Sequence, residues 1–208
     1  MSLELWLAYV LASAVLLVIP GPTILTVISY SLAQGPRARL PLVAAVALGD
    51  STALALSLLG LGALLATSAL WFTAIKTVGG LYLLYLGIRR LRSGVAPGDL
   101  PAPMAPESRL RLFANTWLVT ALNPKGMVFF VAFLPQFITP EAAIAPQLWI
   151  LAITFVVMAV INATLYAMFA AAAHRLLASP RAQRRFNLAG GLLLAAAGVW
   201  ALLARRPA

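Results

Sequence analysis

The stretch ELWLAYVLASAVLLVIPGPTILTVISYSL, residues 4–32, decides how the chain folds. It is almost wholly apolar, and it is longer than the roughly 20 residues that a helix needs to cross a bilayer. Pro20 and Pro22 lack the N–H group of a helical hydrogen bond and clash with the preceding turn, so the helix has to kink or unwind near Pro20. Gly21 makes that unwinding easy. The stretch therefore predicts a membrane-spanning helix that is interrupted along its length.

The rest of the sequence is similarly apolar. Of the 208 residues, 62% are hydrophobic and 10% are charged, whereas a soluble domain is about half apolar and about a quarter charged. A soluble fold with this composition would leave large apolar areas exposed to water. Runs long enough to span a bilayer lie at residues 4–32, 39–66, 69–91, 111–138, 146–174 and 187–204. We therefore predict an all-α, polytopic membrane protein with six transmembrane helices.

Arginines indicate how these helices are oriented. They follow the first run and recur between runs three and four and between runs five and six, at Arg37, Arg39, Arg89, Arg90, Arg92, Arg109, Arg111, Arg175, Arg181, Arg184 and Arg185. Because basic residues concentrate in cytoplasmic loops, these three loops are predicted to be cytoplasmic and both termini to lie outside. Arg205 and Arg206 oppose this assignment, and a chain with five spans and one re-entrant run would reconcile them.

A repeated glycine pattern indicates two related halves. Gly79-Gly80 is followed by Gly87 in the third run, and Gly190-Gly191 is followed by Gly198 in the sixth. Close helix packing alone would explain such glycines, but the first and fourth runs are also both interrupted, at Pro20-Gly21-Pro22 and at Asn123-Pro124-Lys125-Gly126. With three helices in each half, the halves must be inverted. We expect one transmembrane domain over residues 1–208, a 3+3 inverted repeat with broken helices one and four: repeat one at 1–92, a cytoplasmic loop at 93–110 and repeat two at 111–208.

The two interruptions are the first candidates for a binding site. Backbone groups freed from a broken helix cannot face lipid, so they line a wet or protein-enclosed cavity, and the start of a half-helix attracts anions such as a carboxylate. A kink in a packed bundle would explain either break taken singly. The substrate-binding residues expected here are Pro20, Gly21, Pro22, Thr23, Asn123, Pro124, Lys125 and Gly126.

Asp50 is the acidic residue expected to matter most. It lies well inside the second run, where a carboxylate costs roughly 2.5–3.5 kcal/mol on insertion scales. Gly49, Ala53 and Ser57 form a stripe of small residues beside it, which predicts that this side of the helix packs inward. We expect Asp50 to contact the substrate ammonium or to carry the coupled proton; a static pair with Lys76 or Lys125 is the alternative.

Three further polar residues are assigned to the same site. Lys125 would balance Asp50 or meet a substrate carboxylate. Lys76 would do so less directly, because a lysine near a helix end can simply extend to the membrane surface. Asn162 shares a helical face with Thr154 and Tyr166 and would hydrogen-bond either the substrate or another helix.

Several classes of protein are disfavoured by what the sequence lacks. The chain has no cysteine and one histidine, His174, so no metal site or cofactor is expected. No arrangement of nucleophile and base appears, which argues against an enzyme. The net charge of +10 follows the loops between apolar runs rather than one soluble face, so nucleic acid is not an expected partner.

The ordered motifs resemble a known family. They are Pro-Gly-Pro-Thr at 20–23, Leu48-Gly49-Asp50, the stretch from Lys76 to Gly87, and Leu122-Asn123-Pro124-Lys125 running to Phe137. Together they resemble the lysine exporter (LysE) superfamily, most closely its homoserine/threonine resistance (RhtB) branch, over nearly the whole chain. The resemblance implies a secondary transporter in the bacterial cytoplasmic (inner) membrane that exports amino acids or derivatives of the homoserine, threonine, leucine or lysine type, driven by proton exchange.

The expected partners are thus an amino-acid substrate and the lipid bilayer, and assembly into a homo-oligomer stays open. Two alternatives also stay open at this stage. One is a cation exporter of related architecture, which would call for several acids within the membrane. The other is a non-transporting membrane assembly protein.

Overall fold

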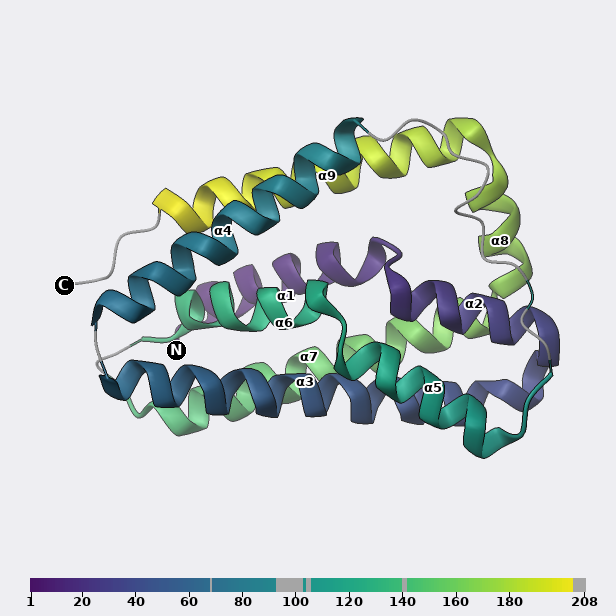
Figure 1. The fold of residues 1–208 in the computed structure, drawn as a ribbon, viewed down its shortest axis with the longest axis horizontal. Coiled ribbons are helices and arrows are strands. Elements are labelled where there is room, and N and C mark those ends of the chain that lie inside the picture. Colours follow the sequence, from purple (N-terminus) through teal and green to yellow (C-terminus); the bar gives the residue numbers. More distant parts are fainter. Residues whose placement is uncertain (68, 93–102, 104–105, 140–141, 204–208) are drawn as a thin grey trace.

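The structure, a computed structural model, describes residues 1–67, 69–92, 103, 106–139 and 142–203; for some helical residues, 60–67 and 69–76 among them, it describes the backbone alone. Over these ranges the chain is helical with short turns and contains no strand (Figure 1), which confirms the all-α prediction. The helices are α1 (Leu3–Val18), α2 (Pro22–Gln34), α3 (Arg39–Thr67), α4 (Ala69–Arg92), α5 (Arg109–Ala121), α6 (Pro124–Ala132), α7 (Ile144–Met168), α8 (Ala170–Ala178) and α9 (Pro180–Leu203), with 3₁₀ turns at Gly35–Ala38 and Leu134–Phe137.

Two of the apolar runs are each divided, at a proline, into a pair of helices. The first gives α1, which ends at Val18, and α2, which begins at Pro22; the fourth gives α5, which ends at Ala121, and α6, which begins at Pro124. Proline stands at the first position of α2 and of α6, where its missing N–H has no partner to lose and its fixed φ suits a helix. The sequence thus restarts a helix immediately after each interruption.

The second half of the chain differs from the prediction in two places. The run at 146–174 is divided at Phe169 into α7 and α8, although it contains no proline or glycine there. In addition, α9 begins at Pro180 rather than near 187, so Arg181, Arg184 and Arg185 lie in its first turns and not in a loop. The pair Ser179-Pro180 is a helix-start signal that accounts for the earlier start.

The α7 helix carries large side chains on its outer face and smaller ones within. Its exposed residues include Ile153, Val157, Ile161 and Leu165, while Ala159, Ala163 and Ala167 are buried. Large apolar groups outside and small residues at helix contacts are typical of helices surrounded by lipid. By length and composition, two helical stretches of the described chain are able to cross a membrane, Pro22–Leu59 and Ile144–Met168.

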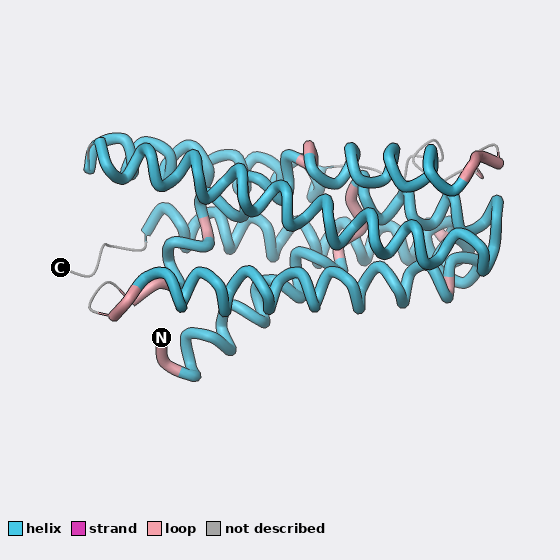
Figure 2. Tube along the Cα trace, turned by 90° about the horizontal axis from the view of Figure 1, so that it is seen from below, coloured by secondary structure: helices cyan, strands magenta, loops and turns pink. Residues whose placement is uncertain are grey.

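The core lies where α3 and α7 pack together. The α1 helix packs on α7, and α5 packs on α3, so each first helix of a half lies against a long helix of the other half. Figure 2 shows most of the helices running along the long axis of the molecule. Aromatic rings fill the centre of this bundle; the Phe130 and Phe155 rings meet edge to face with centroids 4.7 Å apart.

The α4 and α9 helices meet along four glycines, which we call the glycine seam: Gly80, Gly87, Gly191 and Gly198. A Cβ atom on Gly87 would lie 2.5 Å from the backbone nitrogen of Ala195, and one on Gly198 would lie 2.6 Å from that of Leu84. Gly80 also faces Gly198, as Gly87 faces Gly191. Backbone atoms cannot move aside as a flexible side chain would. Only glycine therefore fits at Gly87 and Gly198 without parting the helices.

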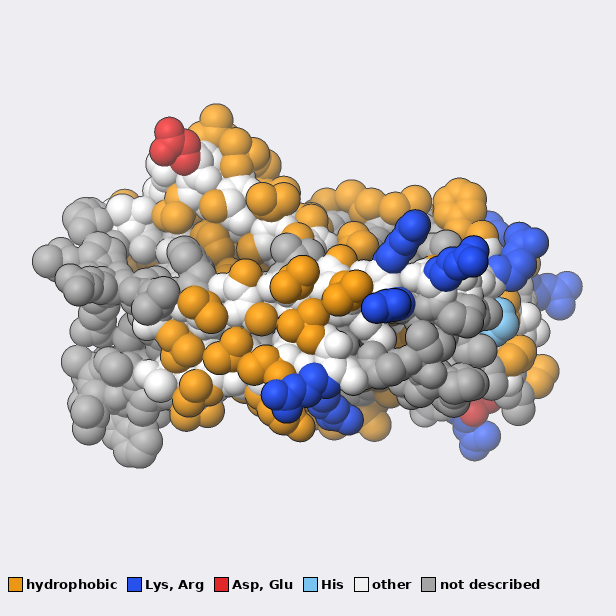
Figure 3. Space-filling view, turned by 90° about the horizontal axis from the view of Figure 1, so that it is seen from above, with side chains coloured by type: hydrophobic (Ala, Val, Ile, Leu, Met, Phe, Trp, Pro, Cys, Tyr) orange, Lys and Arg blue, Asp and Glu red, His pale blue; other side chains and the backbone are white. Residues whose placement is uncertain are grey.

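Charge is distributed unevenly along the bundle. In the view of Figure 3, Lys and Arg side chains gather over one half of the molecule, toward the end where α8 lies, and hydrophobic side chains cover the middle. The N-terminus and the end of α9 lie toward the opposite end (Figure 1). Arg205 and Arg206, and most of the segment predicted as a loop at 93–110, lie outside the described residues.

Candidate functional site

The carboxyl end of α1 lies at the site and carries backbone carbonyls that have no hydrogen-bond donor within the helix. The last four carbonyls of any helix lack an intrahelical donor. In α1 the shortage is fixed by sequence, because the N–H groups that would reach Leu16 and Val18 belong to positions 20 and 22, and both are proline. The carbonyls of Leu16, Leu17, Val18 and Ile19 therefore need donors from elsewhere in the chain.

Lys125 supplies two of these donors. It lies in the first turn of α6, and its Nζ donates to the carbonyl oxygens of Leu16 and Ile19 at 2.8 Å each. Gly21 lies directly beside this side chain, since a Cβ atom there would be 3.4 Å from Nζ. An ammonium group suits the negative end of a helix dipole. Lys125 of the second interrupted run thus provides the cation that binds the carbonyls left open by the first interruption.

Two neutral side chains of α7 complete the set. Asn162 Nδ2 donates to the Leu17 carbonyl at 3.1 Å, and the Tyr166 hydroxyl donates to the Val18 carbonyl at 2.8 Å. Asn162 and Tyr166 are one helical turn apart, so they reach successive carbonyls of α1 from one face. Of the two interpretations offered for Asn162, the structure shows the contact with another helix. Tyr166 was not assigned to the site from the sequence, although its i+4 spacing from Asn162 was the available signal.

A separate hydrogen bond joins the beginnings of α2 and α6. The Asn123 side chain accepts from the Lys125 backbone N–H at 3.1 Å and so caps α6. Its Nδ2 donates to Thr23 Oγ1 at 3.1 Å, within the first turn of α2. Both side chains are buried. One asparagine therefore ends the second interruption and ties it to the first.

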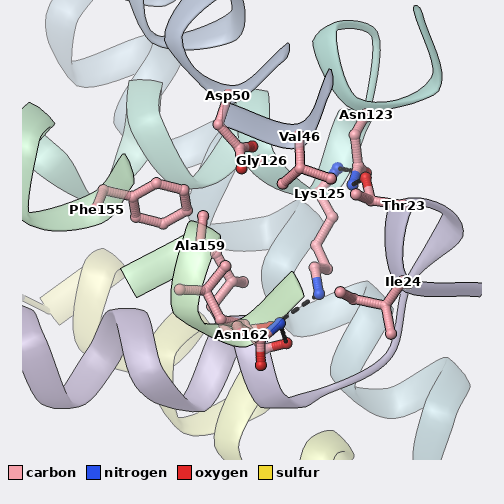
Figure 4. A pocket seen from close by; sticks show the side chains of 13 residues that line it. Thr23, Ile24, Val46, Asp50, Asn123, Lys125, Gly126, Phe155, Ala159 and Asn162 are labelled. Atoms are coloured by element: carbon pink, nitrogen blue, oxygen red, sulfur yellow. Dashed lines mark hydrogen bonds between the residues drawn. The ribbon is translucent and has the colours of Figure 1, made fainter. Parts of the chain in front are cut away.

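These groups enclose a small cavity (Figure 4). Asp50 of α3 points into it and is 9% exposed, and Lys125 lines the same cavity. Phe155 and Ala159 of α7 form an apolar wall. The cavity has room for water centres over about 30 Å³, which is space for about two waters and too little for an amino acid. The side chains that line it therefore have to move before a substrate of that size can enter.

The structure brings together most of the residues that the sequence assigned to the site. Those lining the cavity are Gly21, Thr23, Asp50, Asn123, Lys125, Gly126 and Asn162. Pro20 is buried next to it, whereas Pro22 and Pro124 are exposed at the starts of α2 and α6. Lys76 lies in α4, and its side chain is outside the described part of the structure. Gly49, Ala53 and Ser57 are buried, as the stripe of small residues predicted.

A second polar network lies away from the cavity, near the start of α5. The Tyr30 hydroxyl donates to Glu107 Oε2 at 3.0 Å, and Asn115 Nδ2 donates to both groups at 3.0 Å. Tyr30 is 2% exposed. This network, which we call the Tyr30 network, fastens α2 to the segment that leads into α5. The network was not predicted from the sequence, because Glu107 falls within the predicted loop at 93–110.

Comparison with known proteins identifies the relatives of this architecture. Residues 14–205 match the family described as LysE type translocator. The chain belongs to the LysE family. No group of three or more His, Asp or Glu side chains in the described part of this LysE-family chain is placed to hold a metal ion.

Individual LysE-type relatives match over most of the chain. A membrane protein of uncharacterized function from Vibrio cholerae is 35% identical over 199 residues, 96% of this chain and 97% of that protein. A homoserine/homoserine lactone efflux protein from Salmonella typhimurium is 34% identical over 98% of both chains. A leucine efflux protein from Klebsiella pneumoniae is 26% identical over 66% of this chain and 65% of that protein. No solved structure matches the chain.

The relatives and the helices agree on location. The similar proteins are named membrane or efflux proteins, and the helices described here carry large apolar side chains on their outer faces. The LysE-family chain is a membrane protein, and its family is one of transporters.

Proposed function

We propose that the chain is a secondary transporter that exports amino acids or their close derivatives across the bacterial cytoplasmic membrane. The observation that carries this proposal is the small cavity within the bundle, where an acid, a lysine and the ends of two interrupted runs meet. Polar and ionisable groups are expensive inside a membrane and mark substrate or ion pathways there. The similarity to a homoserine/homoserine lactone efflux protein over 98% of both chains supports the substrate class.

The proposed substrates share one chemical group. Homoserine has a primary ammonium and a carboxylate, whereas its lactone keeps the ammonium and has turned the carboxylate into a cyclic ester. A site that accepts both, as the Salmonella protein's name implies for that protein, has to rely on the ammonium. The carbonyl oxygens at the end of α1 and the Asp50 carboxylate around the cavity suit a cation of this kind.

The proposed architecture is two inverted repeats, residues 1–92 and 111–208, joined by a cytoplasmic loop at 93–110. The glycine seam supports it, because exchanging Gly80 with Gly191 and Gly87 with Gly198 turns each contact of the seam into the other. The packing of α1 on α7 and of α5 on α3 follows the same exchange. Six spans result if α1 with α2, and α5 with α6, each cross the membrane once and α8 continues the span of α7.

The proposed mechanism is alternating access around the small cavity. Residues 20–23 and 123–126 supply the polar backbone at its two interruptions. Asp50 carries the proton that is exchanged for the substrate. The Tyr30 network joins α2 to the start of α5 at the arginine-rich end, and it holds the cytoplasmic side of the site shut. By the positive-inside rule, that end faces the cytoplasm and both termini face outward.

Flux measurements in liposomes test this function. Purified protein would be reconstituted with labelled homoserine inside and a proton gradient across the membrane, and efflux compared for the parent chain, Asp50→Asn and Glu4→Gln. We expect efflux to depend on the gradient, to be lost in Asp50→Asn and to persist in Glu4→Gln, because Glu4 is exposed in the first turn of α1. Proton-coupled efflux that survives in Asp50→Asn removes Asp50 from the mechanism, and no efflux of any amino acid from the parent chain refutes the function.

A further inference from the structure

The carboxyl end of α1 holds an ammonium group that belongs to the protein itself. Lys125 Nζ is bound by the Leu16 and Ile19 carbonyl oxygens at 2.8 Å each. We propose that these two carbonyls are the recognition site for the primary ammonium group of the exported compound, and that Lys125 fills this site whenever no substrate is bound. The inference rests on the proposed export function and specifies which group of the substrate is recognised.

The chemistry of the site selects a cation with N–H groups. A helix end carries a partial negative charge of about half an electron, and two carbonyls converging on one nitrogen match a primary ammonium, which has three donors. The neighbouring carbonyls of Leu17 and Val18 are bound by the neutral donors Asn162 and Tyr166. These neutral contacts hold the end of α1 in shape while the charged position changes its occupant.

Lys125 has another partner within reach of the same cavity. Asp50 lines the cavity together with Lys125 and points into it. Gly21, beside the lysine side chain, leaves space where a Cβ atom would lie 3.4 to 3.7 Å from its outer atoms. When a substrate ammonium takes the two carbonyls, the lysine turns to Asp50, so neither charge is left uncompensated in the membrane. Substrate binding and the pairing of Asp50 are thereby linked through one side chain.

The proposal predicts which compounds bind. Homoserine, its methyl ester and its lactone all keep the primary ammonium and should compete with one another. An α-hydroxy acid analogue, which lacks the ammonium, should not compete, and neither should an N-acetyl amino acid. If Lys125 instead recognised the substrate carboxylate, the lactone would be the weak ligand and the hydroxy acid would remain a competitor.

The experiment uses purified full-length protein and small ammonium probes. In Lys125→Met the two carbonyls lose their occupant, so methylammonium should raise the melting temperature of this variant more than that of the parent chain or of Tyr166→Phe, which keeps Lys125. Tetramethylammonium, which has no N–H group, should give no such difference. Equal effects of methylammonium on all three proteins, or equal effects of the two probes on Lys125→Met, overturn the proposal.

Ligand affinity gives a second readout that does not depend on the stability of one variant. Homoserine lactone should bind Lys125→Met with a dissociation constant about tenfold lower than the parent chain, because a competing ammonium worth ~1.4 kcal/mol has been removed. A higher constant overturns the proposal. If Lys125→Met does not fold, competition on the parent chain tests the proposal. Competition by the ester and none by the hydroxy acid supports it, and the reverse overturns it. Binding that follows these rules in a protein without efflux refutes the transport function alone.

Discussion

The interruption between α1 and α2 and the one between α5 and α6 leave the same kind of unpaired backbone groups, but they are closed in different ways. At the second, Leu122 N–H donates to the Leu118 carbonyl and Asn123 N–H to the Thr120 carbonyl, so the partners are neighbours in sequence. At the first, the donors to the carbonyls of residues 16–19 lie 106 to 148 residues away, in α6 and α7.

This difference separates a local turn from a tertiary contact. The interruption before α6 can form as soon as its own residues are in place, whereas the end of α1 is satisfied only when α6 and α7 are packed against it. Any movement of α6 or α7 away from α1 therefore breaks hydrogen bonds at the end of α1, whereas it leaves the local hydrogen bonds of the second interruption intact.

The largest expected effect is that of Lys125→Met. It leaves two partly buried carbonyls without their donor, and each such group costs about 1–3 kcal/mol, so we expect the free energy of unfolding to fall by about 2–6 kcal/mol. Denaturation in mixed micelles, followed by tryptophan fluorescence, measures it. Lys125→Arg keeps a charged donor and should recover part of the loss. An unchanged stability in Lys125→Met would show that the first interruption does not need its distant cation.

Asn123→Ala tests the local interruption. It removes the cap of α6, worth about 1 kcal/mol, together with the hydrogen bond to Thr23, so we expect a loss of about 1–2 kcal/mol by the same measurement. Thr23→Val leaves the cap of α6 in place but removes the hydrogen bond between Asn123 and Thr23. A loss in Thr23→Val as large as that in Asn123→Ala would mean that the link between α2 and α6, and not the cap, is what matters there.

Tyr166→Phe should have a smaller effect. It removes one neutral donor from the Val18 carbonyl, and side-chain hydrogen bonds in membrane helices contribute about 0.6 kcal/mol on average. Thermal unfolding of Tyr166→Phe beside Lys125→Met gives the ratio directly. If Tyr166→Phe cost as much as Lys125→Met, the distinction between neutral and charged donors at the end of α1 would be lost.

Pro124→Ala is expected to do least. A proline at the first position of a helix has no hydrogen bond to give up, so the stability should change by no more than about 0.5 kcal/mol, as for most substitutions away from special features. The helix content from circular dichroism should be unchanged as well. A large loss would indicate that the second interruption, too, relies on proline to hold its geometry.

Much of the helical pattern was accessible from the sequence because it follows from local chemistry. The restarts at Pro22 and Pro124 come from rules that act within a few residues. The division at Phe169 was missed because no proline or glycine marks it, and the early start of α9 was missed although Ser179-Pro180 announced it. Helix boundaries that depend on packing leave no such mark.

The candidate site divides along the same line. Gly21, Asp50, Asn123 and Lys125 were found because polar or helix-breaking residues are rare in apolar runs. What the sequence could not show is that Lys125 binds the end of α1, since pairing over more than a hundred residues depends on how the helices pack. Tyr166 and the Tyr30 network were missed for the same reason, because an aromatic residue near a helix end has ordinary anchoring roles.

The glycine seam lets backbone atoms of α4 and α9 approach one another directly at Gly87 and Gly198. A pair of helices packed this closely has no long side chains between them at these positions to slide or repack. We therefore expect α4 and α9 to travel together, as one rigid pair, in any rearrangement of the bundle.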